Sequence, residues 1–236
     1  FFKFINKVID FIKFFKHMII NKLTTIENEI KSKIDEFKLS GLNPKIIAVS
    51  KTFPMKDILP LINYGHLHFG ENKVQEAIEK WSDVKISNKL LKLHMIGKLQ
   101  SNKVKYAVDL FDYIHSLDNL KLAETISKEQ KKKGKNLKLF IQVNLGKEDQ
   151  KSGIYPEKIQ EFLKVCVNDL KLNIIGLMCI PPNEINTENF FLQMKRLNEQ
   201  AGLNELSMGM SNDYMEAIKH EASFVRIGSK IFGKRY

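Results

Sequence analysis

The stretch Ile46-Ile-Ala-Val-Ser50, followed by Lys51 and Thr52, is a short apolar run that ends in small polar residues and a lysine. A continuous apolar run of this length is typical of a strand that is buried on both faces of a parallel sheet. Before it, apolar residues recur at three- and four-residue steps over residues 18–39. This spacing predicts a helix, which Gly41 and Pro44 are expected to end.

The same alternation of a short apolar run and a helical segment continues along the chain. Further strands are expected at 67–70, 93–97, 113–116, 137–144, 174–178, 205–207 and 224–227, and one helix separates each from the next. Eight such units favour a parallel sheet closed into a single (β/α)8 barrel of the TIM type, an α/β fold with an extra N-terminal helix. An open, doubly wound sheet is the alternative, although the glycine fingerprint that usually follows its first strand is missing.

Length and composition narrow the class of protein. The chain has 236 residues, of which 43% are hydrophobic, so it can bury a core, and no apolar run is long enough for a transmembrane helix. The net charge of +11 comes from lysines that are spread among 27 acidic residues, so nucleic-acid binding is not expected. Cys166 and Cys179 lack metal-ligand or redox spacing, which favours a reduced, cytoplasmic setting.

Residues 1–17 form a segment rich in phenylalanine and lysine, without an initiator methionine. Their spacing is compatible with a helix lying on a membrane surface. The interpretation we favour is that Met18 is the true start and that 1–17 is an N-terminal extension of uncertain status. The barrel domain is then expected to occupy residues 18–236.

Two neighbouring strand ends near the C-terminus indicate an anion site. They are Leu206-Ser-Met-Gly-Met-Ser-Asn-Asp213 and Phe224-Val-Arg-Ile-Gly-Ser229. Glycine lets backbone N–H groups approach a ligand closely, serine adds a hydroxyl donor, and strands seven and eight of such barrels often bind phosphate. We therefore expect a phosphate cup at these two strand ends.

Lys51 closes the first strand and is expected across the barrel mouth from this cup. Burial disfavours an ammonium group and leaves an amine that can form a Schiff base with a carbonyl compound. Two ligand classes fit a lysine opposite a phosphate cup: a sugar phosphate in a Schiff-base aldolase, and pyridoxal 5′-phosphate (PLP). For PLP, Arg226 would donate to an unprotonated pyridine nitrogen and weaken the electron sink of the ring.

Seven short blocks occur in order over residues 18–236. They are Ala48-Val-Ser-Lys-Thr52, Phe69-Gly-Glu-Asn72 with Gln75-Glu76, His94-Met-Ile-Gly-Lys-Leu-Gln-Ser-Asn-Lys103, Gln142-Val-Asn144, Gly176-Leu-Met178, Leu206-Ser-Met-Gly-Met-Ser211, and Val225-Arg-Ile-Gly228 with Ile231-Phe-Gly233. They resemble the pyridoxal phosphate homeostasis protein family, of the YggS/PROSC type, a relative of the N-terminal domain of alanine racemase. Ser229 stands where that family often has threonine, and Leu93 where it often has tryptophan.

The resemblance implies a (β/α)8 barrel that holds PLP on a lysine, and it gives a role to each matching residue. The implied cofactor-binding residues are Lys51 as the Schiff-base lysine; Ser211, Gly228 and Ser229 at the phosphate, with Ser207 and Met210 alongside; Arg226 at the pyridine nitrogen; Asn72 and Met178 at the ring; and His94 with Gln100-Ser101-Asn102 at the border of the pocket. Lys151 matches a second lysine near the site. No metal is implied.

The resemblance favours a carrier over an enzyme. In alanine racemase a tyrosine from a second domain supplies the acid on the far face of the cofactor, and here the chain ends at Tyr236, just after the last expected strand. We therefore expect storage, buffering or delivery of PLP with little turnover, apo-enzymes as recipients, and a monomer or weak dimer. A racemase-like enzyme is the alternative.

His17, His66, His68 and His220 are expected at surface or packing positions.

Overall fold

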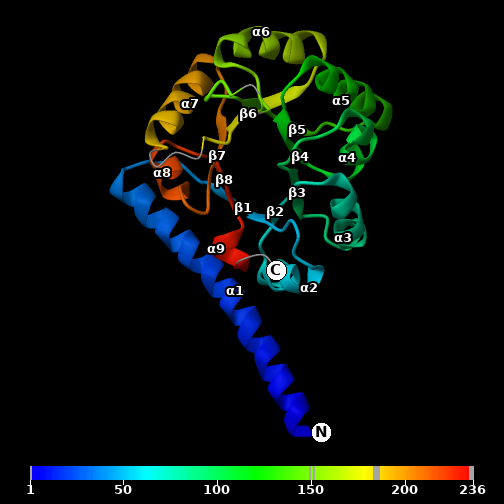
Figure 1. Cartoon of the computed structure of the whole chain (residues 1–236), viewed down its shortest axis with the longest axis vertical. Helices are drawn as coiled ribbons and strands as arrows, with labels where there is room; N and C mark the ends of the chain where they lie inside the picture. The colour runs from blue at the N-terminus through cyan, green and yellow to red at the C-terminus, as the bar shows by residue number, and fades with distance from the viewer. Residues whose placement is uncertain (1, 149, 151, 183–186, 234–236) are drawn as a thin grey trace.

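The computed structural model describes the backbone of residues 2–148, 150, 152–182 and 187–233, and the side chains from His17 onward within these ranges. Eight parallel strands form a closed barrel in sequence order (Figure 1). The strands are β1 (Lys45–Val49), β2 (His68–Glu71), β3 (Lys92–Met95), β4 (Tyr113–Leu117), β5 (Lys138–Val143), β6 (Asn173–Cys179), β7 (Glu205–Met210) and β8 (Phe224–Ile227). The expected (β/α)8 barrel is confirmed, and the open sheet is excluded.

Helices surround the barrel and connect its strands (Figure 1). The α-helices are α1 (Phe2–Glu36), α2 (Met55–Tyr64), α3 (Val74–Ser87), α4 (Val104–Leu110), α5 (Leu120–Lys133), α6 (Ile159–Lys164), α7 (Glu188–Gln200), α8 (Tyr214–Lys219) and α9 (Ser229–Phe232), and shorter turns are η1 (Ser101–Lys103), η2 (Pro156–Lys158) and η3 (Val165–Asp169). Among the described residues no helix is both long and apolar enough to cross a membrane.

The structure differs from the sequence-based expectations at two boundaries and in one additional helix. The first helix begins at Phe2 instead of residue 18 and ends at Glu36 instead of residue 39. Strand β7 continues to Met210 instead of ending at Ser207, and therefore Ser207 lies inside the sheet. The short helix α9 was not expected, because a four-residue segment is too short to show helical periodicity.

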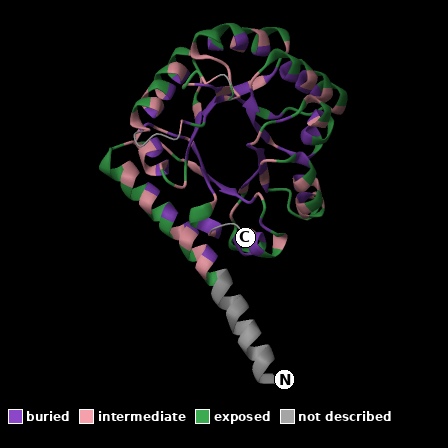
Figure 2. Ribbon diagram, in the orientation of Figure 1, coloured by how far each residue is buried: buried purple, intermediate pink, exposed green. Residues whose placement is uncertain are grey.

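The core has two parts, separated by the wall of the barrel. The larger part lies between the strands and the surrounding helices, whose inner faces are buried and outer faces exposed (Figure 2). The smaller part fills the barrel interior with side chains from five strands, namely Ile47, Tyr113, Phe140, Met178 and Phe224. Filling of this kind makes the barrel a packed core and leaves its ends for binding sites.

Helix α1 packs on the outside of the barrel beside α2, α8 and α9 (Figure 1). Ile19, Leu23, Ile26 and Ile30 are buried on one face of it, at the spacing that predicted the helix. The Tyr214 hydroxyl on α8 donates to the Glu29 carboxylate of α1 and accepts from Lys230 Nζ of α9 at 3.1 Å. These contacts attach α1 to the segment that follows the last strand.

Strands β6 and β7 approach each other closely at Gly176 of β6. A Cβ added there would lie 1.9 Å from the backbone carbonyl oxygen of Glu205 on β7, its register partner. We expect Gly176→Ala to lower the free energy of unfolding by about 3 kcal/mol or more in a urea titration, because the obstacle is backbone and cannot rotate away.

Gly202→Ala is the matched control for this prediction. Gly202 has φ +66° and no atom within 4 Å of the added Cβ, so only the backbone conformation is penalised, by about 1–2 kcal/mol. An equal loss of stability in the two variants would contradict the close approach of β6 and β7.

Candidate functional site

A cavity of about 950 Å³ opens at the C-terminal ends of β1, β2, β7 and β8. In barrels of this type the carboxyl ends of the strands carry the binding groups. Its lining includes seven of the ten candidate residues from the sequence: Lys51, Asn72, Met210, Ser211, Arg226, Gly228 and Ser229. Residues about 180 positions apart in the chain thus meet at one end of the barrel.

The remaining three candidates lie deeper. His94, Met178 and Ser207 are fully buried and are absent from the lining of the cavity. Met178 belongs to the apolar interior of the barrel, and His94 and Ser207 belong to a polar chain described below. The segment Gln100-Ser101-Asn102 is likewise absent from the lining. Lys151 and Tyr236 lie outside the described residues.

The turn after β7 and the turn after β8, where a phosphate cup is expected, adjoin each other. The Ser211 hydroxyl oxygen accepts from the backbone N–H of Gly228 at 3.3 Å, which joins the two turns. Asp213 Oδ1 accepts the backbone N–H of Met210 at 2.6 Å and so fixes the first turn. Gly209 has φ +85°, a conformation that favours glycine, and lies where the register between β7 and β8 shifts.

Arg226 is held in place by two hydrogen bonds inside the barrel. Its Nη1 donates to Ser207 Oγ and its Nη2 donates to the backbone carbonyl of Cys179, each at 2.7 Å. The residue is 5% exposed and still contributes to the cavity lining. Its two anchored donors come from the guanidinium fork, so the direction of the group is fixed before any ligand enters.

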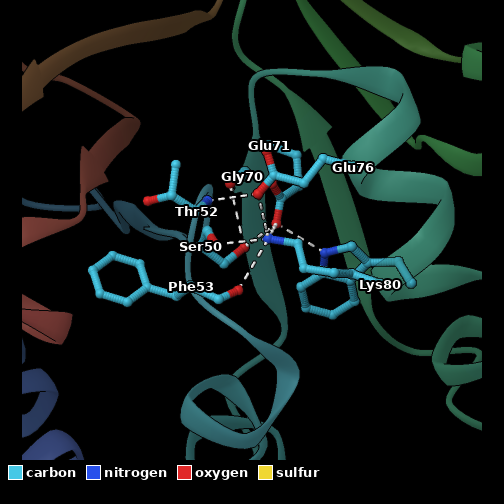
Figure 3. Close-up of polar contacts among 8 residues, drawn as sticks. Ser50, Thr52, Phe53, Gly70, Glu71, Glu76 and Lys80 are labelled. Carbon is cyan, nitrogen blue, oxygen red and sulfur yellow. Dashed lines mark hydrogen bonds and ion pairs between the residues drawn. The ribbon is translucent and has the colours of Figure 1, made fainter. Parts of the chain in front are cut away.

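Lys51 lies in the loop between β1 and α2. Lys80 of α3 contacts this loop through Ser50 and Phe53 (Figure 3). Lys80 Nζ donates to the backbone carbonyl of Ser50 at 2.8 Å and to that of Phe53 at 3.3 Å. Between these residues, the backbone N–H of Thr52 donates to Glu76 Oε1 at 2.5 Å, and Thr52 has φ +69°. The Lys80 ammonium therefore fixes the backbone on both sides of Lys51.

Glu71 is the buried carboxylate that pairs with Lys80 beneath the Lys51 loop. Its Oε1 lies 2.7 Å from Lys80 Nζ and accepts from Ser50 Oγ at 2.7 Å and from Trp81 Nε1 at 3.0 Å. Its Oε2 is buried and has no hydrogen-bond partner among the described residues. Burial raises the pKa of Glu71, and Lys80 opposes that rise. The position of the Lys51 loop thus depends on an ion pair in the core.

Sequence reasoning missed the acidic and apolar parts of the lining. Three acids face the cavity, Glu188, Asp213 and Glu216, together with Phe53, Ile96, Ile180 and the pair Pro181-Pro182. Asp213 directly follows the cup motif, so its position was a usable signal. The acids on α7 and α8 gave no signal, because their approach to the cavity depends on how the helices pack.

One group of described residues has the spacing of metal ligands. Glu188, Glu216 and His220 offer ligand atoms within 4.8 Å of one another. Lys219 Nζ lies 2.6 Å from Glu188 Oε1 and 3.3 Å from Glu216 Oε1, so an ammonium already balances these carboxylates. We therefore assign no metal to this group.

The fold and the cavity together define a class: a (β/α)8 barrel with a lysine, a buried arginine and two adjoining glycine-serine turns at its C-terminal mouth. The chain matches the family of the alanine racemase N-terminal domain over residues 27–236. Solved alanine racemases share the fold, as in the Clostridium difficile protein, with a TM-score of 0.65 over 86% of this chain and 56% of that one at 15% identity.

Closer relatives narrow the class. A protein of Pasteurella multocida named pyridoxal phosphate homeostasis protein is 38% identical over 90% of this chain and 96% of its own length. The Escherichia coli protein of that name is 32% identical over 92% and 97%. PipY of Synechococcus elongatus, solved with PLP bound, has a TM-score of 0.74 at 36% identity over 86% of this chain and all of its own. The chain belongs to the pyridoxal phosphate homeostasis protein family.

The Lys80–Glu71 pair yields a pH-dependent prediction. Lys80→Met should lower the free energy of unfolding by about 3–5 kcal/mol at pH 8, because it leaves a buried carboxylate without its counter-charge. The loss should be smaller at pH 5. A carboxyl whose pKa is raised on folding binds protons more readily in the folded state, so stability falls as pH rises.

Urea titrations at the two pH values measure this effect. Adding Glu71→Gln to the Lys80→Met variant removes the uncompensated charge and should recover part of the stability at pH 8. A loss of stability that is equal at both pH values, or unchanged in the double variant, would contradict the ion-pair account.

Proposed function

We propose that this protein binds PLP in the cavity at the C-terminal mouth and serves in PLP homeostasis by storing, buffering or delivering the cofactor. The observation that carries the proposal is the meeting of Lys51, the Ser211–Gly228 cup and Arg226 in one cavity. The family membership and the PLP-bound structure of PipY support it.

The residues of the cavity fit the chemical groups of PLP. The cup offers the Ser211 and Ser229 hydroxyls and backbone N–H groups for the phosphate, which is the donor set that phosphate requires. Lys51 provides the amine for covalent attachment of the aldehyde. Asn72 and Met210 line the space between these two ends. When bound, PLP supplies an electron sink whose strength depends on the partner of its ring nitrogen.

Arg226 favours a carrier with little turnover. An arginine keeps its proton, so at the ring nitrogen it acts as a donor to an unprotonated nitrogen and leaves the electron sink weak. The fixed position of Arg226 and its place in the cavity lining support this role. A racemase-like activity is the second candidate function, because alanine racemases share this fold.

The cellular compartment, the oligomeric state and the recipients of PLP are also part of the proposal. We propose that the protein acts in the cytoplasm as a monomer or weak dimer and passes PLP to apo-enzymes. Cys166 and Cys179 support a reducing compartment, because both are buried free thiols and burial raises the pKa of each to about 12.

Absorbance tests cofactor attachment. Adding PLP to the purified protein should produce an absorption band near the visible edge that is absent in Lys51→Ala. Lys56→Ala, which removes a lysine outside the cavity lining, is the control and should keep the band. A wild-type protein without the band, or a Lys51→Ala variant that retains it, would refute attachment at Lys51.

Isotope exchange separates the carrier from the enzyme. The PLP-loaded protein is incubated with L-alanine in deuterated buffer, and incorporation at Cα is followed by NMR. We expect exchange far slower than the 1–1000 turnovers per second, in order of magnitude, of typical enzymes, because the ring nitrogen faces Arg226. Exchange at an enzyme-like rate would overturn the carrier proposal.

A further inference from the structure

A chain of hydrogen-bonded histidines crosses the interior of the barrel and ends at Arg226. His68 Nδ1 lies 2.9 Å from His94 Nε2, and His94 Nδ1 lies 2.9 Å from His115 Nε2. His115 Nδ1 lies 2.8 Å from Ser207 Oγ, the same oxygen that accepts from Arg226. The chain thus links β2, β3 and β4 to β7 and β8, on opposite sides of the barrel.

The two ends of this chain have different surroundings. His68 begins β2, is half-buried, and lines a cleft with Pro44, Lys45 and His66 at the N-terminal mouth. His94 and His115 are fully buried among aromatic rings. Tyr113 stacks on His94 with ring centres 4.2 Å apart, and Phe140 stacks on His115 at 4.3 Å. His68 therefore reaches the cleft at the N-terminal mouth, whereas Arg226, at the other end, lines the cavity at the C-terminal mouth.

The three imidazoles are neutral. Burial moves the pKa values of His94 and His115 well below the ordinary range for histidine. Burial, together with His66, Lys45 and Lys92, lowers the pKa of His68 to about 4, although Asp112 opposes this. At pH 7 each ring therefore has one N–H donor and one acceptor nitrogen, and the donor of one ring faces the acceptor of the next.

Ser207 sets the direction of the chain. Its oxygen accepts from Arg226, and its own hydroxyl proton has no partner among the described residues except His115 Nδ1. Leaving a buried donor unpaired costs about 1–3 kcal/mol, so Ser207 donates to His115 Nδ1. His115 Nε2 then donates to His94 Nδ1, and His94 Nε2 donates to His68 Nδ1. Every acceptor nitrogen points toward the guanidinium.

We propose that His115, His94 and His68 are positioning residues that hold Arg226 at the cofactor through Ser207. The chain stabilises the guanidinium with oriented neutral dipoles in place of a carboxylate. The charge of Arg226 therefore remains available to a ligand in the cavity. This inference rests on the proposed function, because it states that the histidine chain increases the affinity for PLP.

Three variants at buried positions inside the barrel test the proposal. The quantity compared is the dissociation constant of PLP, measured by titrating the apoprotein and following the absorption band. His115→Leu removes the acceptor for Ser207 and should weaken binding about tenfold, which corresponds to the upper end of the net contribution of one hydrogen bond. His115→Asn places Oδ1 at the position of Nδ1 and should restore most of the affinity.

Phe140→Leu is the structural control, because it removes packing beside His115 without touching a hydrogen bond. It should lower stability and leave the PLP dissociation constant within about twofold. If Phe140→Leu weakens binding as much as His115→Leu, or if His115→Asn fails to restore affinity in a folded protein, the positioning role is wrong.

Nitrogen-15 NMR of labelled histidines gives a readout that does not depend on the cofactor. At pH 7 we expect His94 and His115 to carry their proton on Nε2 in wild type, and His68→Leu to change the tautomer mixture at His115. Protonation of His115 at Nδ1 in wild type would overturn the inferred direction. Absence of PLP binding by wild type would refute the proposed function, whereas the tautomers, measured without PLP, separately test the direction of the hydrogen-bonded chain.

Discussion

The pairing of β1 with β8 is the constraint on which the site depends. It closes the barrel by setting Ile47 opposite Arg226 and Ala48 opposite Ile227, and so joins the first strand to the last. Lys51 follows β1 and the Gly228–Ser229 turn follows β8, so the same pairing brings the lysine and this turn into one cavity. In an open sheet these two strands would lie at separate edges, and no cavity would contain both groups.

Two supports hold the groups that the closed barrel brings together. On the outside of β1 and β2, Lys80 pairs with buried Glu71 and fixes the carbonyl groups on both sides of Lys51. Inside the barrel, Ser207 and the carbonyl of Cys179 fix Arg226. A buried charge is costly unless it is paired or hydrogen-bonded, so both supports offset the burial of a charge and also fix groups beside the cavity. This coupling explains how a binding site can be rigid before its ligand arrives.

The local pattern of the sequence predicted the barrel because each strand is a continuous apolar run and each helix has an apolar face. Residues 46–50, 93–97 and 113–116 all correspond to strands within a residue or two. The prediction was weaker at β7, where Gly209 and small polar residues in an apolar run suggested an early turn, although the strand continues to Met210. The meeting of Lys51, Ser211 and Gly228 in one cavity could be predicted, because in a parallel barrel all strands end at the same mouth.

The sequence by itself determined the number and order of the strands, the lysine and the two glycine-serine turns, since these follow from residues close together in the chain. Only the tertiary structure decided that Lys80 of α3 supports the Lys51 loop. It alone placed His94 and Ser207 in one hydrogen-bonded chain instead of at the cavity, and joined His68 to that chain instead of leaving it as a separate packing residue. The physical reason is that these contacts join residues that are 21 to 92 positions apart, across a closed barrel. Periodicity fixes which face of a strand a side chain occupies, but the partner on that face depends on strand register and tilt.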